Sequence, residues 1–234
     1  MKKVILAFIM FFIMTSASLA DSNVYITQSG ASLDLDITMD GNNNAIGASN
    51  DRTLLTGANL DVDIDLIGAS NVITGDFIGA GESGSDDLKI SQTGSTNTTA
   101  LNIVSSAATD DVSIIENRIG SSGVTSYLVG SAATVQDVSI TVDVVGDDID
   151  IAISEQSTST GSDKTTDIDI GTDSDDVDII ITHTGAGAHK TKLLCTGSCA
   201  GSDFTMSQTG VNSTNVDLIV TNATSSDVDI TITD

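Results

Sequence analysis

Alternation between aliphatic and polar residues constrains the fold of this chain more than any other feature. Side chains that repeat with a period of two point to opposite faces of a β-strand. The alternating stretches include 33–37, 60–66, 148–151, 167–170, 176–179 and 227–230, and in each of them Asp separates Val, Ile or Leu. We therefore expect strands with one aliphatic and one acidic face. Ser, Thr, Asp, Asn, Gly, Val and Ile dominate after residue 20, so no helix is expected there.

Short alternating runs recur along the whole chain after residue 20. Their starts lie near 24, 33, 46, 60, 72, 87, 101, 112, 125, 138, 149, 167, 177, 190, 203, 216 and 228. The mean step is about 13 residues, so a pair of runs repeats about every 25 residues, within the range of solenoid repeats. Gly, Asn, Ser and Asp clusters separate the runs, as expected for turns. No break in composition divides them, which predicts a single degenerate-repeat domain over residues 21–234.

Two all-β architectures fit this pattern. A β-sandwich or barrel would usually contain large aromatic residues, whereas only Tyr25, Phe77, Tyr127 and Phe204 follow residue 20. A β-solenoid of stacked strand-turn-strand repeats needs only a thin aliphatic interior. The chain also has no Pro, which suits strands that donate hydrogen bonds on both sides. We favour the solenoid, with the sandwich as the alternative. The sustained alternation argues against disorder, which is otherwise common in acidic chains with few aromatic residues.

Residues 1–20 have the three parts of a secretory signal peptide. Lys2 and Lys3 form the positive region, 4–14 is an unbroken apolar run, and small side chains at Ser18 and Ala20 fit cleavage before Asp21. Eleven apolar residues are too few to span a bilayer, so a membrane anchor is disfavoured. We expect a secreted, extracellular or surface-attached protein with no transmembrane segment after signal removal.

Two cysteines lie close together in the sequence, at Cys195 and Cys199. In an oxidising compartment we expect a local disulfide that holds a turn. A zinc site is less well supported, because two thiolates do not supply the further ligands that zinc requires. His183 and His189 lie nearby without a recognised ligand spacing.

Four segments share a pattern of an apolar residue, a hydroxyl residue, Gln or His, a second hydroxyl residue and Gly. They are 26–30, 90–94, 181–185 and 206–210, and their central and last residues are Gln28 and Gly30, Gln92 and Gly94, His183 and Gly185, and Gln208 and Gly210. An amide at a strand end can bond to the same amide one coil away and form a ladder. Glycine two residues later permits a turn. The alternative is that polar residues simply end these strands.

The second segment resembles the curlin repeat of curli-type bacterial surface fibres, whose pattern is Gln-x-Gly-x-x-Asn-x-Ala. Gln92, Gly94 and Asn97 match it, and the segments at Gln28 and Gln208 match its first half. The resemblance implies an exported subunit that stacks strand-turn-strand units and polymerises through its end strands into an amyloid-like fibre. It also implies an outer-membrane secretion channel and a surface nucleator as partners.

Acidic residues outnumber basic ones by 33 to eight, which gives a formal net charge of -25. Removal of the signal peptide would leave a charge near -27. Such a field excludes nucleic acid as a partner and opposes close stacking of strands. Salt, mild acid or Ca²⁺ should therefore favour stability or assembly. Asp61, Asp63 and Asp65 and the cluster at 173–178 are candidates for loosely bound Ca²⁺, although no calcium-loop motif occurs and a solvated acidic face is the simpler interpretation.

No catalytic constellation is apparent. The carboxylates are regularly spaced, neither His has a Ser or Cys nucleophile arrangement, and no phosphate loop or dinucleotide motif is present. We expect no enzyme activity and no required cofactor. The leading hypothesis is a secreted structural protein that forms or decorates a curli-like fibre for adhesion, aggregation or biofilm matrix. The alternative is a monomeric acidic surface adhesin that binds cations or another ligand.

Overall fold

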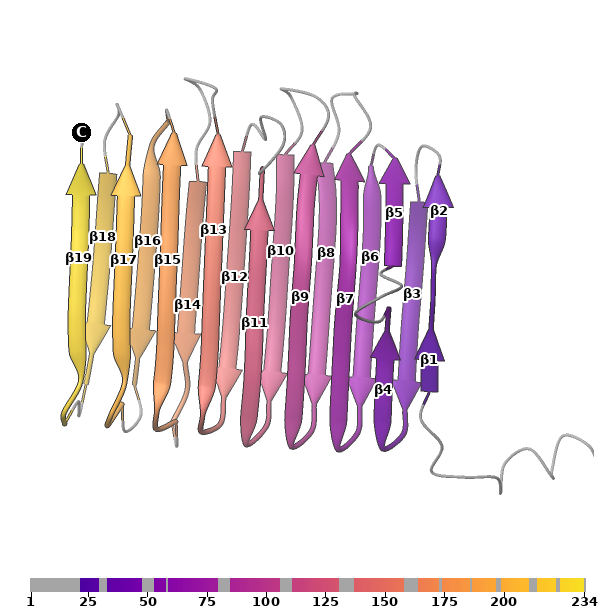
Figure 1. The fold of residues 1–234 in the computed structure, drawn as a ribbon, viewed down its shortest axis with the longest axis horizontal. Helices are drawn as coiled ribbons and strands as arrows, with labels where there is room; N and C mark the ends of the chain where they lie inside the picture. Colours follow the sequence, from indigo (N-terminus) through magenta and orange to yellow (C-terminus); the bar gives the residue numbers. More distant parts are fainter. Residues whose placement is uncertain are drawn as a thin grey trace, which may run out of the picture.

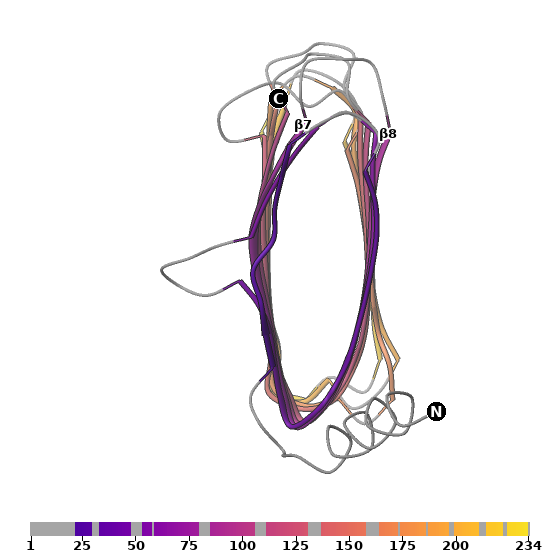
Figure 2. The ribbon, with the colours of Figure 1, turned by 90° about the vertical axis from the view of Figure 1, so that its right-hand side faces the viewer.

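The protein is a parallel β-solenoid (Figures 1 and 2). The computed structural model describes residues 22–29, 33–47, 53–57, 59–79, 85–105, 111–130, 137–157, 164–172, 174–185, 187–196, 199–210, 214–221 and 224–233. These residues form strands and no helix. The predicted solenoid is confirmed and the sandwich alternative is wrong, because the described strands pair in parallel whereas a sandwich is built from antiparallel strands.

The strands belong to two sheets that face each other across the interior (Figure 2). Sheet A has eleven strands: β1 (Ser22–Val24), β2 (Thr27–Ser29), β4 (Asn43–Ile46), β5 (Thr53–Gly57), β7 (Ser70–Gly79), β9 (Thr96–Ser105), β11 (Ser122–Val129), β13 (Ile149–Ser157), β15 (Val177–Gly185), β17 (Asp203–Thr209) and β19 (Asp227–Thr233). Sheet B has eight: β3 (Leu33–Asp40), β6 (Leu60–Ile67), β8 (Ser85–Thr93), β10 (Asp111–Ile119), β12 (Asp137–Val145), β14 (Lys164–Ile170), β16 (His189–Cys195) and β18 (Thr214–Val220).

Successive coils stack in register along the long axis of the molecule (Figure 1). In each coil the chain runs along a strand of sheet B, turns, and returns along a strand of sheet A. The repeat is about 26 residues, close to the spacing of about 25 expected from the sequence. Equivalent residues of neighbouring coils are therefore hydrogen-bonded neighbours. We call each such line of equivalent residues a row.

The interior is filled by the aliphatic side of each alternating strand. Leu60, Val62, Ile64 and Leu66 of β6 are buried, whereas Asp61 between them is exposed. Neighbouring coils place Val, Ile and Leu at most of the same positions, so the interior rows are largely apolar stacks, interrupted at some positions by buried polar side chains. The expected two-faced strand is thus present, and Val, Ile and Leu form most of its inward face.

The turns that join sheet B to sheet A in the N-terminal half share a Gly-x-x-Asn pattern that the sequence interpretation did not single out as a repeat. An added Cβ at Gly68 would lie 1.8 Å from the carbonyl oxygen of Gly41, and one at Gly94 would lie 1.9 Å from that of Gly68. The turns therefore stack too closely for any side chain at this position. The same spacing of 26 or 27 residues brings the Asn residues into line.

Candidate functional site

The four motif segments do not lie at equivalent places in the solenoid. The segment ending at Gly94 closes β8 in sheet B, whereas 181–185 and 206–210 lie in or just after β15 and β17 of sheet A. The segment 26–29 includes β2, also in sheet A, and Gly30 lies outside the described residues. Gln28, His183 and Gln208 nevertheless belong to one row, in which His183 and Gln208 are direct neighbours.

Gln92 bonds across the interior rather than along its row. Its Oε1 lies 3.2 Å from the Thr99 hydroxyl, and its Nε2 lies 3.4 Å from the backbone oxygen of Thr98. Its neighbours in the row are Leu66 and Arg118. The described structure therefore places no second amide beside Gln92.

An amide ladder is formed instead by asparagines at the turns. Asn44 Nδ2 donates to Asn71 Oδ1 at 3.0 Å, and Asn71 Nδ2 donates to Asn97 Oδ1 at 2.9 Å. Asn71 Nδ2 also lies 3.1 Å from the backbone oxygen of Thr93 in the next coil. The ladder ends at Asn97, because Gly123 follows in the row and leaves room for the Arg118 guanidinium.

A buried carboxylate lies near the centre of the solenoid. Glu116 projects inward from β10 and accepts hydrogen bonds from three side chains of sheet A: Thr99 at 2.9 Å, Thr125 at 3.0 Å and Tyr127 at 2.8 Å. Burial is the largest influence on Tyr127 and raises its pKa well above the usual value, with the Glu116 charge acting in the same direction. The Tyr127 hydroxyl therefore stays protonated and donates to the carboxylate.

Arg118 supplies the compensating charge in the same region. Its Nη1 donates to the Thr125 hydroxyl at 2.8 Å, and that hydroxyl in turn donates to Glu116. Burial lowers the pKa of Arg118, while the Glu116 charge opposes this shift. A buried cation and a buried anion are thus linked through one threonine.

A second polar cluster lies closer to the C-terminal end. Thr166 Oγ1 donates to Glu155 Oε1 at 2.8 Å and lies 3.0 Å from His183 Nε2. Gln208 Nε2 lies 3.4 Å from His183 Nδ1 and donates to the Thr191 hydroxyl at 2.7 Å. Since an amide nitrogen can only donate, Nδ1 of His183 is the acceptor and its Nε2 carries the hydrogen. His183 and Gln208 therefore make one direct step of a polar ladder.

His189 completes this cluster at the start of β16. Its Nε2 lies 3.1 Å from the backbone oxygen of Gly185, and its ring centre is 5.5 Å from that of His183. Burial lowers the pKa of His189; Lys164 and His183 lower it further, whereas the bond to Gly185 and the charge of Glu155 raise it. The side chains of this cluster are buried and link the two sheets inside the solenoid.

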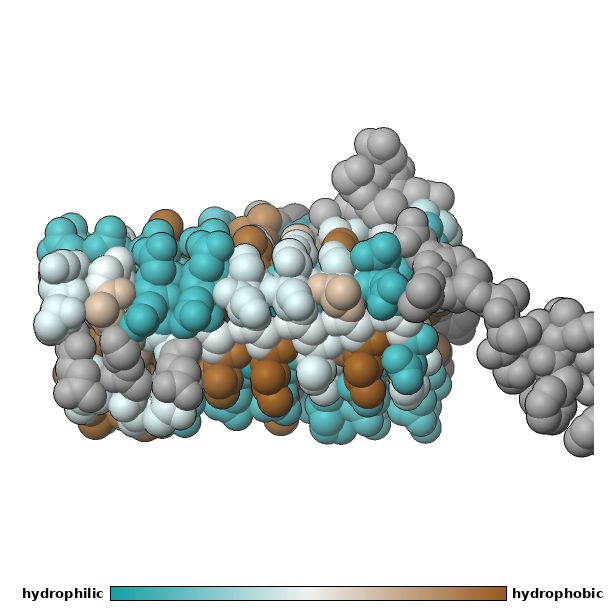
Figure 3. Space-filling model, turned by 90° about the horizontal axis from the view of Figure 1, so that it is seen from below, coloured by the Kyte–Doolittle hydropathy of each residue, from teal (hydrophilic) through white to brown (hydrophobic). Residues whose placement is uncertain are grey.

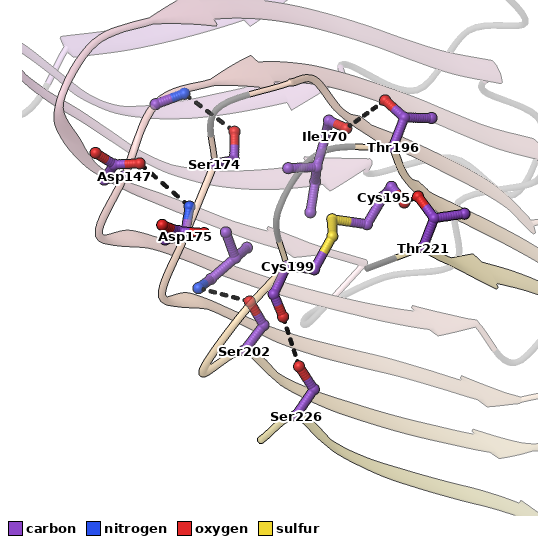
Figure 4. The surroundings of a disulfide bond; sticks show 12 residues. Asp147, Ile170, Ser174, Asp175, Cys195, Thr196, Cys199, Ser202, Thr221 and Ser226 are labelled. Atoms are coloured by element: carbon purple, nitrogen blue, oxygen red, sulfur yellow. Dashed lines mark hydrogen bonds between the residues drawn. A yellow bond between two sulfur atoms is a disulfide. The ribbon is translucent and has the colours of Figure 1, made fainter. Parts of the chain in front are cut away.

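Cys195 and Cys199 form a disulfide at the turn between β16 and β17 (Figure 4). Both residues are fully buried. The turn is also held by hydrogen bonds to the neighbouring coils: Thr196 bonds to the oxygen of Ile170, and Ser226 to that of Cys199. The bridge thus lies inside a stack of hydrogen-bonded turns.

The outer faces carry the Asp residues in rows. Asp150, Asp178, Asp203 and Asp227 are consecutive in one row of sheet A. Burial raises the pKa of Asp150, and the charge of Asp178 raises it further. No group of three or more His, Cys, Asp or Glu side chains in the described part of the chain is arranged to hold a metal ion.

Two lysines neutralise part of the acidic face of sheet B. Lys89 Nζ lies 3.2 Å from Asp63 and 3.9 Å from Asp61, so Asp61 and Asp63 of the expected calcium trio face an ammonium group. Lys192 Nζ lies 2.8 Å from Asp167 and 3.1 Å from Asp169. Each lysine contacts two carboxylates of the preceding coil.

The two ends of the solenoid are open within the described residues. At the C-terminal end, the inward-facing Val228, Ile230 and Ile232 of β19 are 43, 40 and 46% exposed. At the N-terminal end, Leu35 and Ile37 of β3 are only partly buried. The described strands at both ends have an unpaired edge, and such edges bind further strands. These ends are the candidate interaction surface.

Comparisons with protein-family models, with curated proteins and with solved structures found no match to this chain. Among the residues that the structure describes, no helix is long and apolar enough to cross a bilayer. The solenoid architecture and its repeat are thus the established properties of this chain.

Proposed function

We propose that this protein is a secreted structural subunit that stacks end to end into a curli-like, amyloid-type extracellular fibre. The two open ends carry this proposal. Within the described part of the chain, each end presents an unpaired strand edge from both sheets, together with apolar side chains that would be covered by another coil. Because every internal coil is buried by its neighbours, a second copy of the chain is the partner whose shape and hydrogen-bonding pattern fit an end.

The signal peptide expected at residues 1–20 and the resemblance to the curlin repeat support export and assembly at the cell surface. An outer-membrane secretion channel and a surface nucleator belong to the same proposal. A fibre of this kind would serve adhesion, aggregation or biofilm matrix.

Electron microscopy and fibre diffraction of the purified protein test the proposal. We expect unbranched fibres with a spacing of about 4.8 Å along the axis, the distance between neighbouring strands. Replacement of Ile230 by Lys should reduce fibre formation, because it places a charge in the end surface. Replacement of Ile180 by Lys is the matched control, since Ile180 is 53% exposed on the outer face. Absence of fibres from the wild type at every salt concentration would contradict the proposal.

The row of four Asp residues on sheet A favours a second candidate, a monomeric acidic adhesin that binds cations or another ligand. Equilibrium dialysis with Ca²⁺, combined with sedimentation analysis, separates the two. Stoichiometric Ca²⁺ binding by a protein that stays monomeric would favour the adhesin.

A further inference from the structure

We propose that copies of this chain join with their internal registers continued across the junction, and that Asp217 of one copy then faces Asp36 of the next and makes joining dependent on salt. This inference rests on the proposed function and names the contact that regulates it. The partner is a second copy of the chain.

The register follows from the rows of sheet A. One row contains Asn23, Ala45, Val72, Thr98, Val124, Asp150, Asp178, Asp203 and Asp227. If the row continues, Asn23 of the next copy follows Asp227. Val24 then stacks on Val228, and Ile26 stacks on Ile230. The aliphatic side of β1–β2 thus meets the aliphatic side of β19.

The rows of sheet B predict the same register for the junction. One row contains Asp36, Asp63, Lys89, Ile115, Thr141, Asp167, Lys192 and Asp217. Its continuation places Asp36 of the next copy beside Asp217. Leu35 then stacks on Val216, and Ile37 stacks on Leu218. These four side chains are partly buried in the single copy and pack against its core, so the junction would extend that core.

At the junction between two copies, the outer-face residues of sheet B fit one another less well than the interior residues do. Within the chain, Lys89 contacts Asp63 and Lys192 contacts Asp167 in this row. At the junction, Asp217 is followed by Asp36 and then Asp63, with no cation between them. Neighbouring strands lie about 4.8 Å apart, so these carboxylates repel each other, and salt screens the repulsion.

Replacement of Asp36 by Lys tests the junction directly. The introduced ammonium group would lie between Asp217 and Asp63, so the row would alternate in sign from Asp167 to Lys89. In about 10 mM salt, where charges act over about 30 Å, we expect self-seeded fibres of D36K to grow about tenfold faster than wild-type fibres. In about 1 M salt the difference should disappear.

Two further variants separate the contact from net charge. D143K makes the same charge change on the outer face of β12, far from both ends, and should grow like the wild type. The double variant D36K/D217K places two lysines in contact and should grow slowly again in low salt, although its net charge is the smallest. Thermal unfolding of each variant shows that the subunit is folded.

The inference is overturned if D36K grows no faster than D143K in low salt, or if D36K/D217K grows fastest. Wild-type fibres that form in high salt would then still support the proposed function. Absence of fibres from all variants under all conditions would instead overturn both.

Discussion

At the scale of single residues, the two acidic amino acids, Glu and Asp, occupy different places in the solenoid. The chain has 33 acidic residues, of which three are Glu. The two that the structure describes, Glu116 and Glu155, are fully buried. Each reaches across the interior: Glu116 from sheet B to sheet A, and Glu155 from sheet A to Thr166 in sheet B. Asp is one methylene shorter, and it lines the solvated outer faces.

Glu116 should be costly to remove alone and much less costly to remove together with Arg118. Replacement of Glu116 by Leu leaves the Arg118 guanidinium buried without its compensating charge, which should cost about 3–5 kcal/mol of the free energy of unfolding. E116L/R118M removes both charges and should recover most of this loss. Urea denaturation measures the difference. A double variant as unstable as E116L would show that the two charges do not compensate each other.

His189 should make stability fall in mild acid. Its pKa is lowered in the folded state, so the unfolded chain binds the proton more readily. Stability is then fully present above the unfolded pKa of about 6.5 and is lost as pH falls toward the folded value, at up to about 1.4 kcal/mol per pH unit. H189Q should flatten this slope in thermal unfolding between about pH 6.5 and 5. Equal slopes in both proteins would contradict the prediction.

The raised pKa of Asp143 acts with the opposite sign. Burial is its main cause, and the charges of Asp169 and Asp167 add to it. The folded state therefore binds a proton more readily than the unfolded chain, and stability rises as pH falls through the folded pKa toward the unfolded value of about 3.8. The two groups therefore respond to acid with opposite signs: protonation of His189 weakens the fold, and protonation of Asp143 stabilises it.

At the scale of elements, the stacked turns set the spacing of the coils. The backbone nitrogen of Gly94 donates to the oxygen of Ile119, and that of Gly120 donates to the oxygen of Val145. Each turn is therefore bonded to the next strand of sheet B. The close approach of the turns leaves no room for a side chain between them.

Replacement of Gly120 by Ala should destabilise the protein, whereas replacement of Gly41 by Ala should cost little of the free energy of unfolding. An added Cβ at Gly120 would lie 2.1 Å from the backbone oxygen of Gly94. At Gly41 the nearest atom is Asn44 Oδ1, at 3.1 Å. We expect G120A to lose about 1–3 kcal/mol of the free energy of unfolding, measured by urea denaturation. Similar losses in both variants would show that coil spacing at the turns is adjustable.

For the whole molecule, charge is distributed unevenly along the axis. The outward residues of β10 from Ser113 to Ile119, and those of β11, are uncharged. Seen from the side of the short turns, pale and brown residues interrupt the hydrophilic surface in the middle of the molecule (Figure 3). Ile119 at the end of β10 and Val145 at the end of β12 are 58% and 41% exposed. The Asp rows are concentrated toward the two ends, where assembly would take place.

The environment of each carboxylate should decide the effect of its removal. Asp178 lies between Asp150 and Asp203, so D178N should raise the thermal midpoint by about 1–3 °C in low salt. Asp63 contacts Lys89 at 3.2 Å, so D63N should lower the thermal midpoint or leave it unchanged. Both effects should shrink in high salt. A rise of equal size in both variants would indicate that net charge alone controls stability.

The alternating pattern and the strand spacing were sufficient to predict the architecture and the approximate repeat. They were not sufficient to align the coils. The sequence motif grouped Gln92 with His183 and Gln208, yet Gln92 lies on the opposite sheet. The recurrence of Gly and Asn at spacings of 26 and 27 residues was the signal that could have fixed the alignment.

The sequence by itself determined that this chain forms two-faced strands, because side-chain direction in a strand depends only on local backbone geometry. Which side chains meet was decided by the tertiary structure. Glu116 and Tyr127 lie 11 positions apart and on different sheets, and Glu155 meets His183 one coil later. Such contacts depend on the length of each turn, since a shift of one residue would exchange the interior and exterior faces.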